Sequence, residues 1–480
     1  MSSFAERLDF LVASGESAFL ELAGHLDAEW LGAALKAAEF VDVRRRRLPA
    51  EQVMVLVLAM ALFRDRSIHA VMSHLNLGLG DTDAPVPSAS VQARYRVGVE
   101  PLRQLFCISA QHWQERAPRS GYAGMRVVAI DGTHMRIPDS DANDAYFGRP
   151  GARAKGVGGY PQVRIAAVLD VDSRLVQDAN FVPWTDSEAA ACAPLWERLP
   201  TDALVILDRG FPSFHTVQKY FGEQKQRHAL IRLRSNQKFE SCEDLIDGSY
   251  LTWWEPSTGA LQKAREQDEP VPTATFVRVI EYETLTKERA RLVTTLLDPV
   301  LHPAEELVQM YAERWEIEVA YDELKYHLAP ERITLRSTKP EGILQELWGY
   351  LTAYNLVRWE MIRVSVLHKV EPRRVSFQNT YMVLQTAWLL MANQADTAGA
   401  VATLERMEKN VLLLILPARR RRSCARVVKV KMSNYAKKPV DPEKVKQHTQ
   451  KKEERAAARN TKTKTNKKVP ASPRKNSQIS

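Results

Sequence analysis

The sequence predicts a mixed α/β fold, in which helices pack on a sheet and helical regions lie on either side of it. Three observations lead to this prediction. Apolar spacing is helical before Gly121 and strand-like after it. Three neighbouring strand-like segments then precede a helix, after which strands and helices alternate. A stretch rich in Trp and Pro interrupts this alternation at residues 237–300, and helical spacing returns beyond it.

Helical spacing dominates residues 1–120, which we predict to be an all-helical N-terminal domain. Its longest apolar run, residues 53–63, is too short to span a bilayer. Four adjacent arginines, Arg44–Arg47, either contact DNA phosphates or keep a turn solvated. DNA binding through a helix-turn-helix is compatible with this region, although no motif specifies it.

Residues 121–236 are predicted to form the first part of the sheet. Two of the predicted strands lead into Asp-Gly and Asp-Arg-Gly sequences at Asp131 and Asp208. Ser187 is a plausible N-cap for the helix between them. The predicted elements are strands at 126–137, 160–172 and 175–184, a helix at 187–198, a strand at 203–207, a helix at 213–221 and a strand at 228–234.

The remaining chain is predicted to complete this core and extend it. Residues 237–300 are a β-rich insertion with strands at 275–282 and 290–297. Residues 301–366 are predicted to form two long helices, at 304–327 and 342–366. C-terminal helices follow at 367–417, and the tail comprises residues 418–480.

Composition excludes several classes of protein. The chain has 480 residues, 45% apolar and 26% charged, as in globular proteins with a substantial core. Its four cysteines form no CxxC pair and no Cys/His cluster, which fits a reducing compartment and gives no zinc-site signal. The N-terminus lacks signal-peptide features, so we expect a cytoplasmic protein without membrane contact.

The positive charge is concentrated at one end. The formal net charge is +9, yet residues 418–480 alone hold 21 Lys and Arg against 4 Asp and Glu, so the body is net negative. Such a tail, predicted to be disordered past about residue 440, either contacts DNA independently of sequence or is merely solvated.

Four polar side chains share one stripe of the helix predicted at 304–327. At about 100° per residue they fall within roughly a 60° arc. They are Tyr311, Arg314, Glu318 and Lys325. On spacing alone, ordinary salt-bridge pairs on an amphipathic helix are the simpler interpretation, and Asp322 also lies near the stripe.

Three carboxylates are nevertheless placed to converge. Asp131 and Asp208 lie at or near strand ends, where ligands gather in open mixed sheets, and Glu318 lies on the helix after the insertion. Carboxylate oxygens suit Mg²⁺, and two such ions stabilise the attacking and leaving oxygens of a phosphoryl displacement.

These segments resemble those of DDE transposases of the insertion sequence 4 family. The family signature is Tyr, two residues, Arg, three residues, Glu, six residues, Lys, and it is met completely by the four residues of the stripe. The sequences Ile130-Asp131-Gly132-Thr133 and Leu207-Asp208-Arg209-Gly210-Phe211 match the segments that hold the first and second catalytic aspartates. The resemblance covers roughly residues 30–435 and is specific, because the motifs occur in the family's order.

The resemblance implies a ribonuclease H-like (retroviral-integrase-like) core, interrupted by a β-strand insertion ahead of the glutamate. It implies cleavage at insertion-sequence ends and strand transfer into target DNA. The cofactor is Mg²⁺, for which Mn²⁺ substitutes, and Asp131, Asp208 and Glu318 hold two ions. It further implies a homodimer on double-stranded DNA, in which each subunit cuts the end held mainly by the other, and nucleoid association while DNA is bound.

Other residues receive roles on the same basis. Tyr311, Arg314 and Lys325 are expected to hold phosphates that flank the scissile bond, with pairing to Glu318 or Asp322 as the structural alternative. For Arg209, DNA contact and a stabilising salt bridge stay open. The resemblance includes stacking of a flipped base on an aromatic residue of the insertion, for which Trp253 and Trp254 are candidates, with an ordinary place in the core as the alternative.

Two other functions fit the same sequence. One is a nuclease that cuts DNA without strand transfer. The other is a transposase-derived DNA-binding protein that has lost catalysis, against which the complete acidic triad argues.

Overall fold

The computed structural model describes residues 28–41, 48–75, 87–150, 159–211, 214–234, 237, 239–266, 273–284, 287–328, 335–391, 403, 406–413 and 415–417. One compact unit comprises Met1–Gly148 and Pro161–Arg426, and the features below belong to it. The arginines at 44–47, the basic tail and the predicted helices before residue 28 lie outside the described residues.

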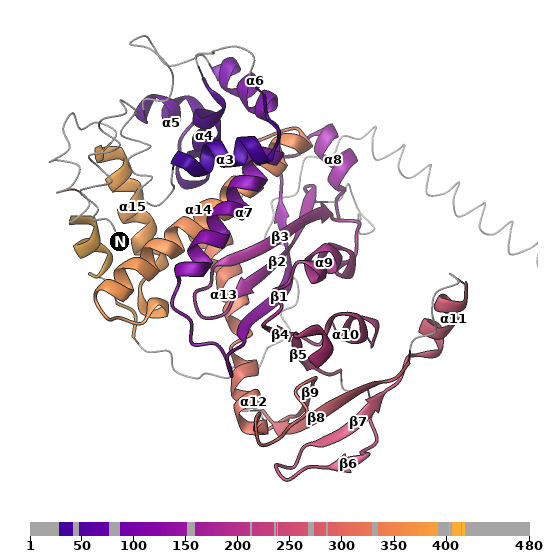
Figure 1. Cartoon of the computed structure of the whole chain (residues 1–480). Helices are drawn as coiled ribbons and strands as arrows, with labels where there is room; N and C mark the ends of the chain where they lie inside the picture. Colours follow the sequence, from indigo (N-terminus) through magenta and orange to yellow (C-terminus); the bar gives the residue numbers. More distant parts are fainter. Residues whose placement is uncertain are drawn as a thin grey trace, which may run out of the picture. The chain divides into compact units, whose positions relative to one another are not determined.

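A sheet with the strand order β3-β2-β1-β4-β5-β9-β8-β7-β6 forms the framework of this unit (Figure 1). The first three strands pair antiparallel, whereas β4 and β5 run parallel to β1. This is the predicted meander followed by alternating strands and helices. The strands are β1 (Arg126–Arg136), β2 (Gln162–Asp170), β3 (Val176–Pro183), β4 (Ala203–Leu207), β5 (His228–Arg232), β6 (Glu243–Asp244), β7 (Tyr250–Trp254), β8 (Thr275–Glu283) and β9 (Arg289–Thr294).

The insertion continues the same sheet. Strand β9 pairs antiparallel with β5, and β8, β7 and β6 follow outward from it. A helix within the insertion, α11 (Thr258–Glu266), was not predicted from the sequence. The insertion therefore lengthens the sheet on the side of β5 and leads the chain back to the helices that follow.

Helices cover both faces of the first five strands. The described helices are α3 (Ala28–Ala37), α4 (Ala50–Leu62), α5 (Ile68–His74), α6 (Pro87–Val97), α7 (Glu100–Arg116), α8 (Asp141–Phe147), α9 (Glu188–Glu197), α10 (Phe214–Tyr220), α12 (Ala304–Ala312), α13 (Trp315–Asp322), α14 (Pro340–Leu367) and α15 (Phe377–Met391). Side chains alternate between the two faces of β1. Val127 and Ala129 belong to one core, to which α7, α13 and α14 contribute. Val128 and Ile130 belong to the other core, to which α9 and α10 contribute. Figure 1 shows these two groups of helices on opposite sides of the strands.

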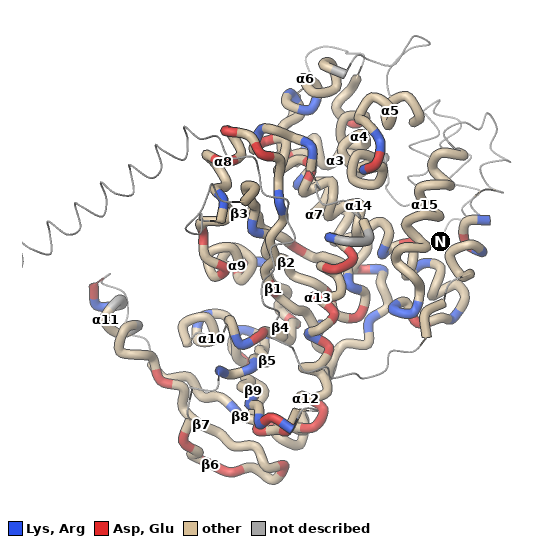
Figure 2. The backbone as a smooth tube through the Cα atoms, turned by 180° about the vertical axis from the view of Figure 1, so that it is seen from behind, with Lys and Arg blue, Asp and Glu red and all other residues tan. Residues whose placement is uncertain are grey.

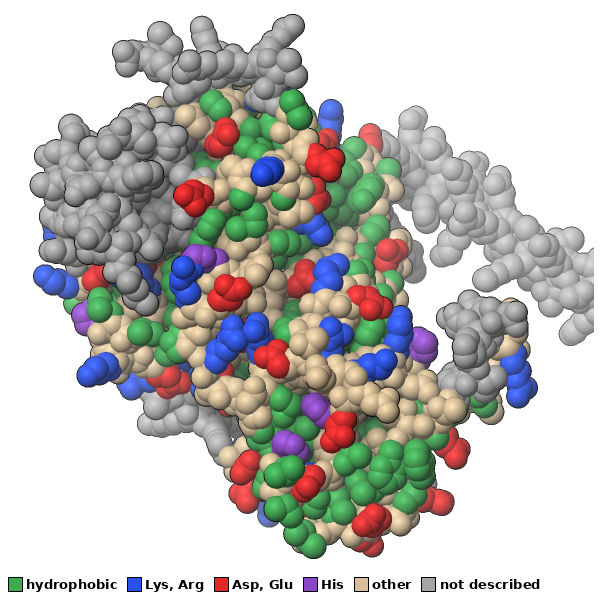
Figure 3. Space-filling model, in the orientation of Figure 1, with side chains coloured by type: hydrophobic (Ala, Val, Ile, Leu, Met, Phe, Trp, Pro, Cys, Tyr) green, Lys and Arg blue, Asp and Glu red, His purple; other side chains and the backbone are tan. Residues whose placement is uncertain are grey.

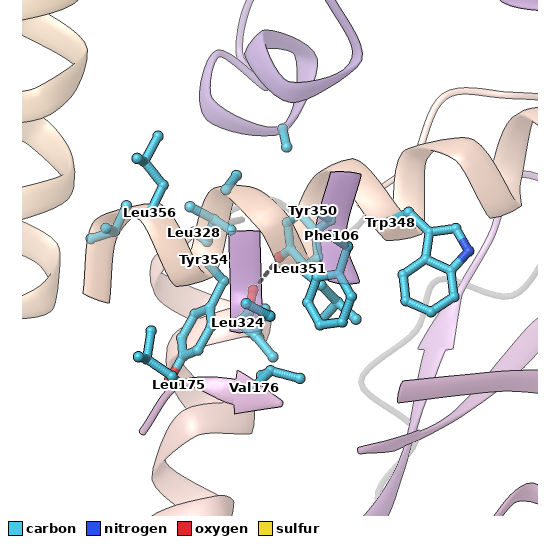
Figure 4. Packing of buried hydrophobic residues seen from close by; sticks show 14 of the residues in the cluster. Phe106, Leu175, Val176, Leu324, Leu328, Trp348, Tyr350, Leu351, Tyr354 and Leu356 are labelled. Atoms are coloured by element: carbon cyan, nitrogen blue, oxygen red, sulfur yellow. Dashed lines mark hydrogen bonds between the residues drawn. The ribbon is translucent and has the colours of Figure 1, made fainter. Parts of the chain in front are cut away.

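Helix α14 is the centre of the larger core. Most of its side chains are buried, and Trp348 packs against Phe106 of α7 with ring centroids 5.2 Å apart (Figure 4). Helix α4 lies so close that a Cβ on Gly349 of α14 would meet Cγ1 of Val57 at 2.7 Å. The N-terminal helices are thus part of the same compact unit as the sheet, and a division at residue 120 stays a prediction.

The prediction of one regular helix over 304–327 was wrong. The segment consists of α12, α13 and a π-helical turn, η3 (Glu323–His327). Between the first two, the N–H groups of Glu313 and Arg314 bond carbonyls three residues back, at 3.0 and 3.2 Å, which tightens the winding. A stripe calculated at 100° per residue therefore does not hold along the whole segment. None of the described helices is long and apolar enough to cross a membrane.

Candidate active site

Asp131 lies in β1, and Asp208 follows directly after β4, the neighbouring parallel strand. Strand β1 pairs with β4 over Arg126–Ala129, with Ala129 facing Ile206. Two residues further along, the same register sets Asp131 opposite Asp208, directly after β4 ends. Adjacent strands are about 4.8 Å apart, so the two carboxylates belong to one site. The predicted proximity of the two strand ends is therefore present in the fold.

The carboxylate of Asp131 is half-buried among other charges, with its side chain 20% exposed. Its Oδ1 accepts a hydrogen bond from the Gly132 N–H at 2.8 Å, and its Oδ2 lies 3.9 Å from Nη1 of Arg314. Burial raises the pKa of Asp131 to about 6; the Gly132 N–H and Arg314 oppose this rise, and the charges of Asp208 and Glu188 add to it. Negative charge in this site is thus only partly compensated by the protein.

A tight turn fixes Asp208 after β4. The Gly210 N–H donates to Oδ1 of Asp208. Arg234 donates from Nε to the carbonyl of Arg209 at 2.9 Å and from Nη2 to the carbonyl of Gly210 at 3.2 Å. The side chain of Arg209 itself is exposed. The turn therefore directs Asp208 toward the site and Arg209 toward solvent.

Glu318 joins the aspartates through an arginine. Nη2 of Arg314 lies 2.6 Å from Oε1 of Glu318, and Nη1 of the same guanidinium faces Asp131. The expected structural alternative, pairing of Arg314 with Glu318, is thus the contact present in the structure. Helices α12 and α13 themselves contain acidic residues but no Lys or Arg (Figure 2).

Two side chains from α13 and η3 bind β1 beside Asp131. The Tyr321 hydroxyl donates to the carbonyl oxygen of Asp131 at 2.7 Å, and Lys325 Nζ donates to Oγ1 of Thr133. Thr133 and Asp131 point to the same face of β1, since they are two residues apart. Burial lowers the pKa of Lys325, while Asp131 and Asp322 act against that shift. Lys325 thus lies at the edge of the site, where the charge of Asp131 acts on it.

Buried ion pairs connect α13 to the turn between β2 and β3, and η3 to that turn and to α14. Arg174, in the turn between β2 and β3, pairs with Glu316 of α13 and, at 3.2 Å, with Glu323 of η3. Arg358 of α14 also pairs with Glu323, whose Oε2 accepts from the Tyr354 hydroxyl at 3.3 Å. We call these residues the rear charge network. It fixes the two glutamates that neighbour Glu318 and Lys325 in sequence.

The remaining predicted residues occupy different surroundings. Tyr311 is buried in the larger core, and burial raises the pKa of its hydroxyl. Trp253 is 53% exposed and Trp254 only 6%, because consecutive residues of β7 point to opposite faces. Trp254 packs against Phe239 in the smaller core, whereas exposed apolar side chains gather over the insertion in Figure 3. Of the two tryptophans, Trp253 is thus the one available to a ligand.

A fourth carboxylate, Glu188 at the start of α9, was not identified from the sequence. Burial raises the pKa of Glu188 and the charge of Asp208 adds to the rise, whereas Arg164 and the Gly132 N–H oppose it. Glu188 thus lies close to both aspartates. The sequence offered only a faint signal, because an acid after an N-cap serine is common on any helix.

The donor set suits a divalent metal in type. Asp131, Asp208 and Glu188 bring carboxylate oxygens, the ligands that Mg²⁺ and Mn²⁺ prefer, to a site with excess negative charge. In the described part of the chain, however, no three His, Cys, Asp or Glu side chains are arranged so as to hold an ion. Glu318 is engaged by Arg314 instead.

Comparisons with known proteins identify the family of the chain. The family described as "Insertion element 4 transposase N-terminal" matches residues 16–107, and "Transposase DDE domain" matches residues 122–356. The transposase InsG for insertion sequence element IS4 of Escherichia coli strain K12 is 34% identical over 422 residues, which cover 87% of this chain and 93% of that protein. Among solved structures, a piggyBac transposase synaptic complex with hairpin DNA has a TM-score of 0.38 and 11% identity, and the match covers 85% of this chain and 86% of that one. This structural likeness is too weak to support an argument, but the sequence matches suffice: the chain belongs to the insertion sequence 4 family of DDE transposases.

Proposed function

We propose that this transposase cuts DNA at the ends of its insertion sequence and joins those ends to target DNA by metal-dependent phosphoryl transfer. The observation that supports the proposal is the parallel register of β1 and β4, which pairs Ala129 with Ile206, two residues before Asp131 and Asp208. Glu318 lies across one guanidinium from Asp131, so the three carboxylates of the DDE triad face a common region.

The chemistry follows from the donors present. Asp131, Asp208 and Glu318 would hold two Mg²⁺ or Mn²⁺ ions, which supply activation of the attacking oxygen and stabilisation of the leaving oxygen. Water attacks the scissile phosphorus, and the bond to the 3′ oxygen breaks, which yields a 3′-hydroxyl and a 5′-phosphate. The 3′-hydroxyl then attacks a phosphodiester of the target and displaces its 3′ oxygen, so the number of phosphodiester bonds is conserved in the second step.

Arg314 and Lys325 are suited to hold the DNA phosphates beside the scissile bond. Arg314 lies between the carboxylates of Glu318 and Asp131, whose negative charges favour a cation there. A DNA phosphate would offer the guanidinium of Arg314 a bidentate partner. When Arg314 moves to that phosphate, Glu318 becomes free to bind metal. Lys325 is anchored on Thr133, next to Asp131 along the same face. Tyr311 is buried and supports the packing of α12 next to this region.

Trp253 is the residue we assign to stacking of a flipped base. Trp253 is exposed on β7 and packs against Phe276 with ring centroids 4.7 Å apart. An aromatic face is therefore available for a base to stack on. Trp254 belongs to the core and has no such role. The exposed Arg209 is assigned to backbone contact with DNA, since it follows Asp208 directly and its side chain points outward. Two copies of the chain would act together on a pair of transposon ends, which size measurements of the DNA complex can test.

A joining assay tests the proposed function. The protein is incubated with Mg²⁺, a duplex that ends in the terminal inverted repeat from the DNA flanking its gene, and a plasmid. We expect ends joined to the plasmid by the wild type, and neither cutting nor joining by Asp208→Ala, although this variant still binds the duplex. Asp322→Ala is the matched control, because Asp322 is exposed on the same helix as Glu318 and should leave activity largely intact.

The outcomes separate the competing functions. Cutting without joining would indicate a nuclease. Binding without cutting by the wild type would indicate a DNA-binding protein that has lost catalysis. An Asp208→Ala variant as active as the wild type would refute the assignment of the site.

A further inference from the structure

Glu188 reaches the active site from the opposite face of the sheet. It is the first residue of α9, which Ser187 caps by accepting a hydrogen bond from the Ala190 N–H at 3.1 Å. Helix α9 packs on the face of β1 that carries Val128 and Ile130. The next residue on that face is Gly132, so α9 directs Glu188 at the one position of β1 beside Asp131 that has no side chain.

The two glycines of the aspartate motifs make room for this carboxylate. A Cβ on Gly132 would meet Oε1 of Glu188 closer than real Cβ atoms approach any atom, and it would lie 3.2 Å from both Cγ and Cδ. A Cβ on Gly210 would lie 3.8 Å from Oε2 of Glu188 and 2.8 Å from Oδ1 of Asp208. Neither glycine has a positive φ, so backbone conformation does not require them. At Gly132, a Cβ would instead displace the Glu188 carboxylate from its present position.

An ordinary role for Glu188 at a helix N-terminus does not explain this placement. An acid there needs only to stay near the helix end, usually in solvent. Glu188 is instead half-buried, with one oxygen against Gly132 and the other toward Gly210 and Asp208. Arg164 is the nearby cation that favours the ionised carboxylate, but its Nε donates to the carbonyl of Asp186 at 3.0 Å.

We infer that Glu188 is a fourth carboxylate of the active site, which holds the divalent ion at Asp131 and Asp208 either directly or through one water molecule. The inference rests on the proposed function, because it needs the metal that the two aspartates would bind. Glu188 would supply that ion with a further oxygen donor from α9, beside Asp131 and Asp208, whereas Glu318 on α13 is paired with Arg314.

Binding of Mn²⁺ to the full-length, DNA-free protein tests this role without reference to catalysis. The free-ion signal in electron paramagnetic resonance gives the affinity for the wild type and for Glu188→Gln, which removes the charge but keeps the shape. Glu197→Gln is the matched control, because Glu197 lies at the other end of α9 and bonds the surface residues Lys219 and Tyr220. We expect Glu188→Gln to weaken Mn²⁺ binding by about 10–100-fold, as is usual for groups that support a metal, and Glu197→Gln to bind as the wild type does.

Gly132→Ala provides a second variant, should Glu188→Gln fail to fold. It keeps every carboxylate but forces Glu188 away from the aspartates, so it too should bind Mn²⁺ more weakly. If Asp208→Asn loses Mn²⁺ while Glu188→Gln and Gly132→Ala bind like the wild type, the role of Glu188 is refuted and the proposed function stands. If Asp208→Asn binds like the wild type, or the wild type binds no Mn²⁺, the metal centre and the role of Glu188 fall together.

Discussion

Replacement of Arg174 by Met should destabilise the protein far more than loss of a surface ion pair does. Arg174 and Arg358, with side chains 4% and 2% exposed, balance the charges of Glu316 and Glu323. Without Arg174, two buried carboxylates lose one of the guanidinium groups that pair with them. Glu316 loses the ion-pair partner that ties α13 to the turn between β2 and β3. The helix that carries Glu318 would then lose its attachment on that side.

The expected cost is about 3–5 kcal/mol of unfolding free energy, the usual range when one partner of a buried ion pair is removed. Arg174 has a φ of +58°, and Met is an L-residue with the same backbone cost there, so the substitution changes charge and hydrogen bonding rather than backbone strain. Arg103→Met is the matched control. Its pair with Glu100, at 2.9 Å, is 38% and 50% exposed, for which we expect less than about 1 kcal/mol.

Denaturant unfolding followed by tryptophan fluorescence measures both variants against the wild type. A double variant, Arg174→Met with Glu316→Gln, completes a cycle in which the neutral amide should recover part of the loss. If Arg174→Met cost no more than Arg103→Met, or if the double variant were simply additive, the rear charge network would not hold α13 as described.

Three further predictions concern single sites. Burial raises the pKa of Asp131 from 3.8 to about 6, so the folded, metal-free protein loses stability as the pH rises through 6. Above pH 6, Asp131→Asn should therefore be more stable than the wild type by up to about 3 kcal/mol in metal-free thermal unfolding. This advantage should disappear below about pH 4. Gly349→Ala places a Cβ against the facing valine of α4 and should lower the unfolding free energy by about 1–3 kcal/mol. Gly32→Ala, also within a helix but with open space around it, should raise the unfolding free energy by about 0.5–1 kcal/mol. Equal effects of the two substitutions in denaturant unfolding would contradict the close approach of α4 and α14. Trp254→Ala should lower the unfolding free energy by about 3–5 kcal/mol, because Trp254 is buried. Trp253→Ala should leave stability nearly unchanged but impair processing of DNA ends. The reverse pattern would show that the two faces of β7 are wrongly assigned.

The strand order near the site could be predicted because the local signals agree with the fold. Buried-type residues lead into Asp131 and Asp208, and in both cases a glycine follows the aspartate within two positions. Parallel pairing of β1 with β4 then brings the aspartates together without any further requirement. The order of strands, helices and insertion was predictable for the same reason.

The break within residues 304–327 could not be predicted, because no Gly or Pro marks it. The tightened turn at Arg314 and the π-helical turn after Asp322 occur between residues with partners far away in sequence. Glu316 and Glu323 pair with Arg174, and the Tyr350 hydroxyl donates to the carbonyl of Leu324 (Figure 4). Tertiary contacts thus decide the winding of this segment, and with it the direction of Glu318.

Glu188 was missed for a related reason. Its immediate sequence, Ser187-Glu188, is typical of any helix start. Its position depends on which face of β1 lacks a side chain at Gly132, and this is known only once α9 is seen to pack on that face. A Cβ at Gly132 would collide with the Glu188 carboxylate, so the absence of a side chain there leaves room for it.

Metal dependence of the cleavage step is tested most directly by DNA in which sulfur replaces the bridging 3′ oxygen at the scissile phosphate. Sulfur binds Mg²⁺ poorly and the softer Mn²⁺ better. If metal held by Asp131 and Asp208 stabilises the leaving atom, the wild type should cut the sulfur-containing DNA far more slowly than normal DNA in Mg²⁺, and Mn²⁺ should restore the rate. Asp208→Asn should cut neither DNA in either metal. Equal rates for the sulfur-containing DNA in Mg²⁺ and Mn²⁺, or wild-type cleavage by Asp208→Asn, would contradict a metal centre at these two aspartates.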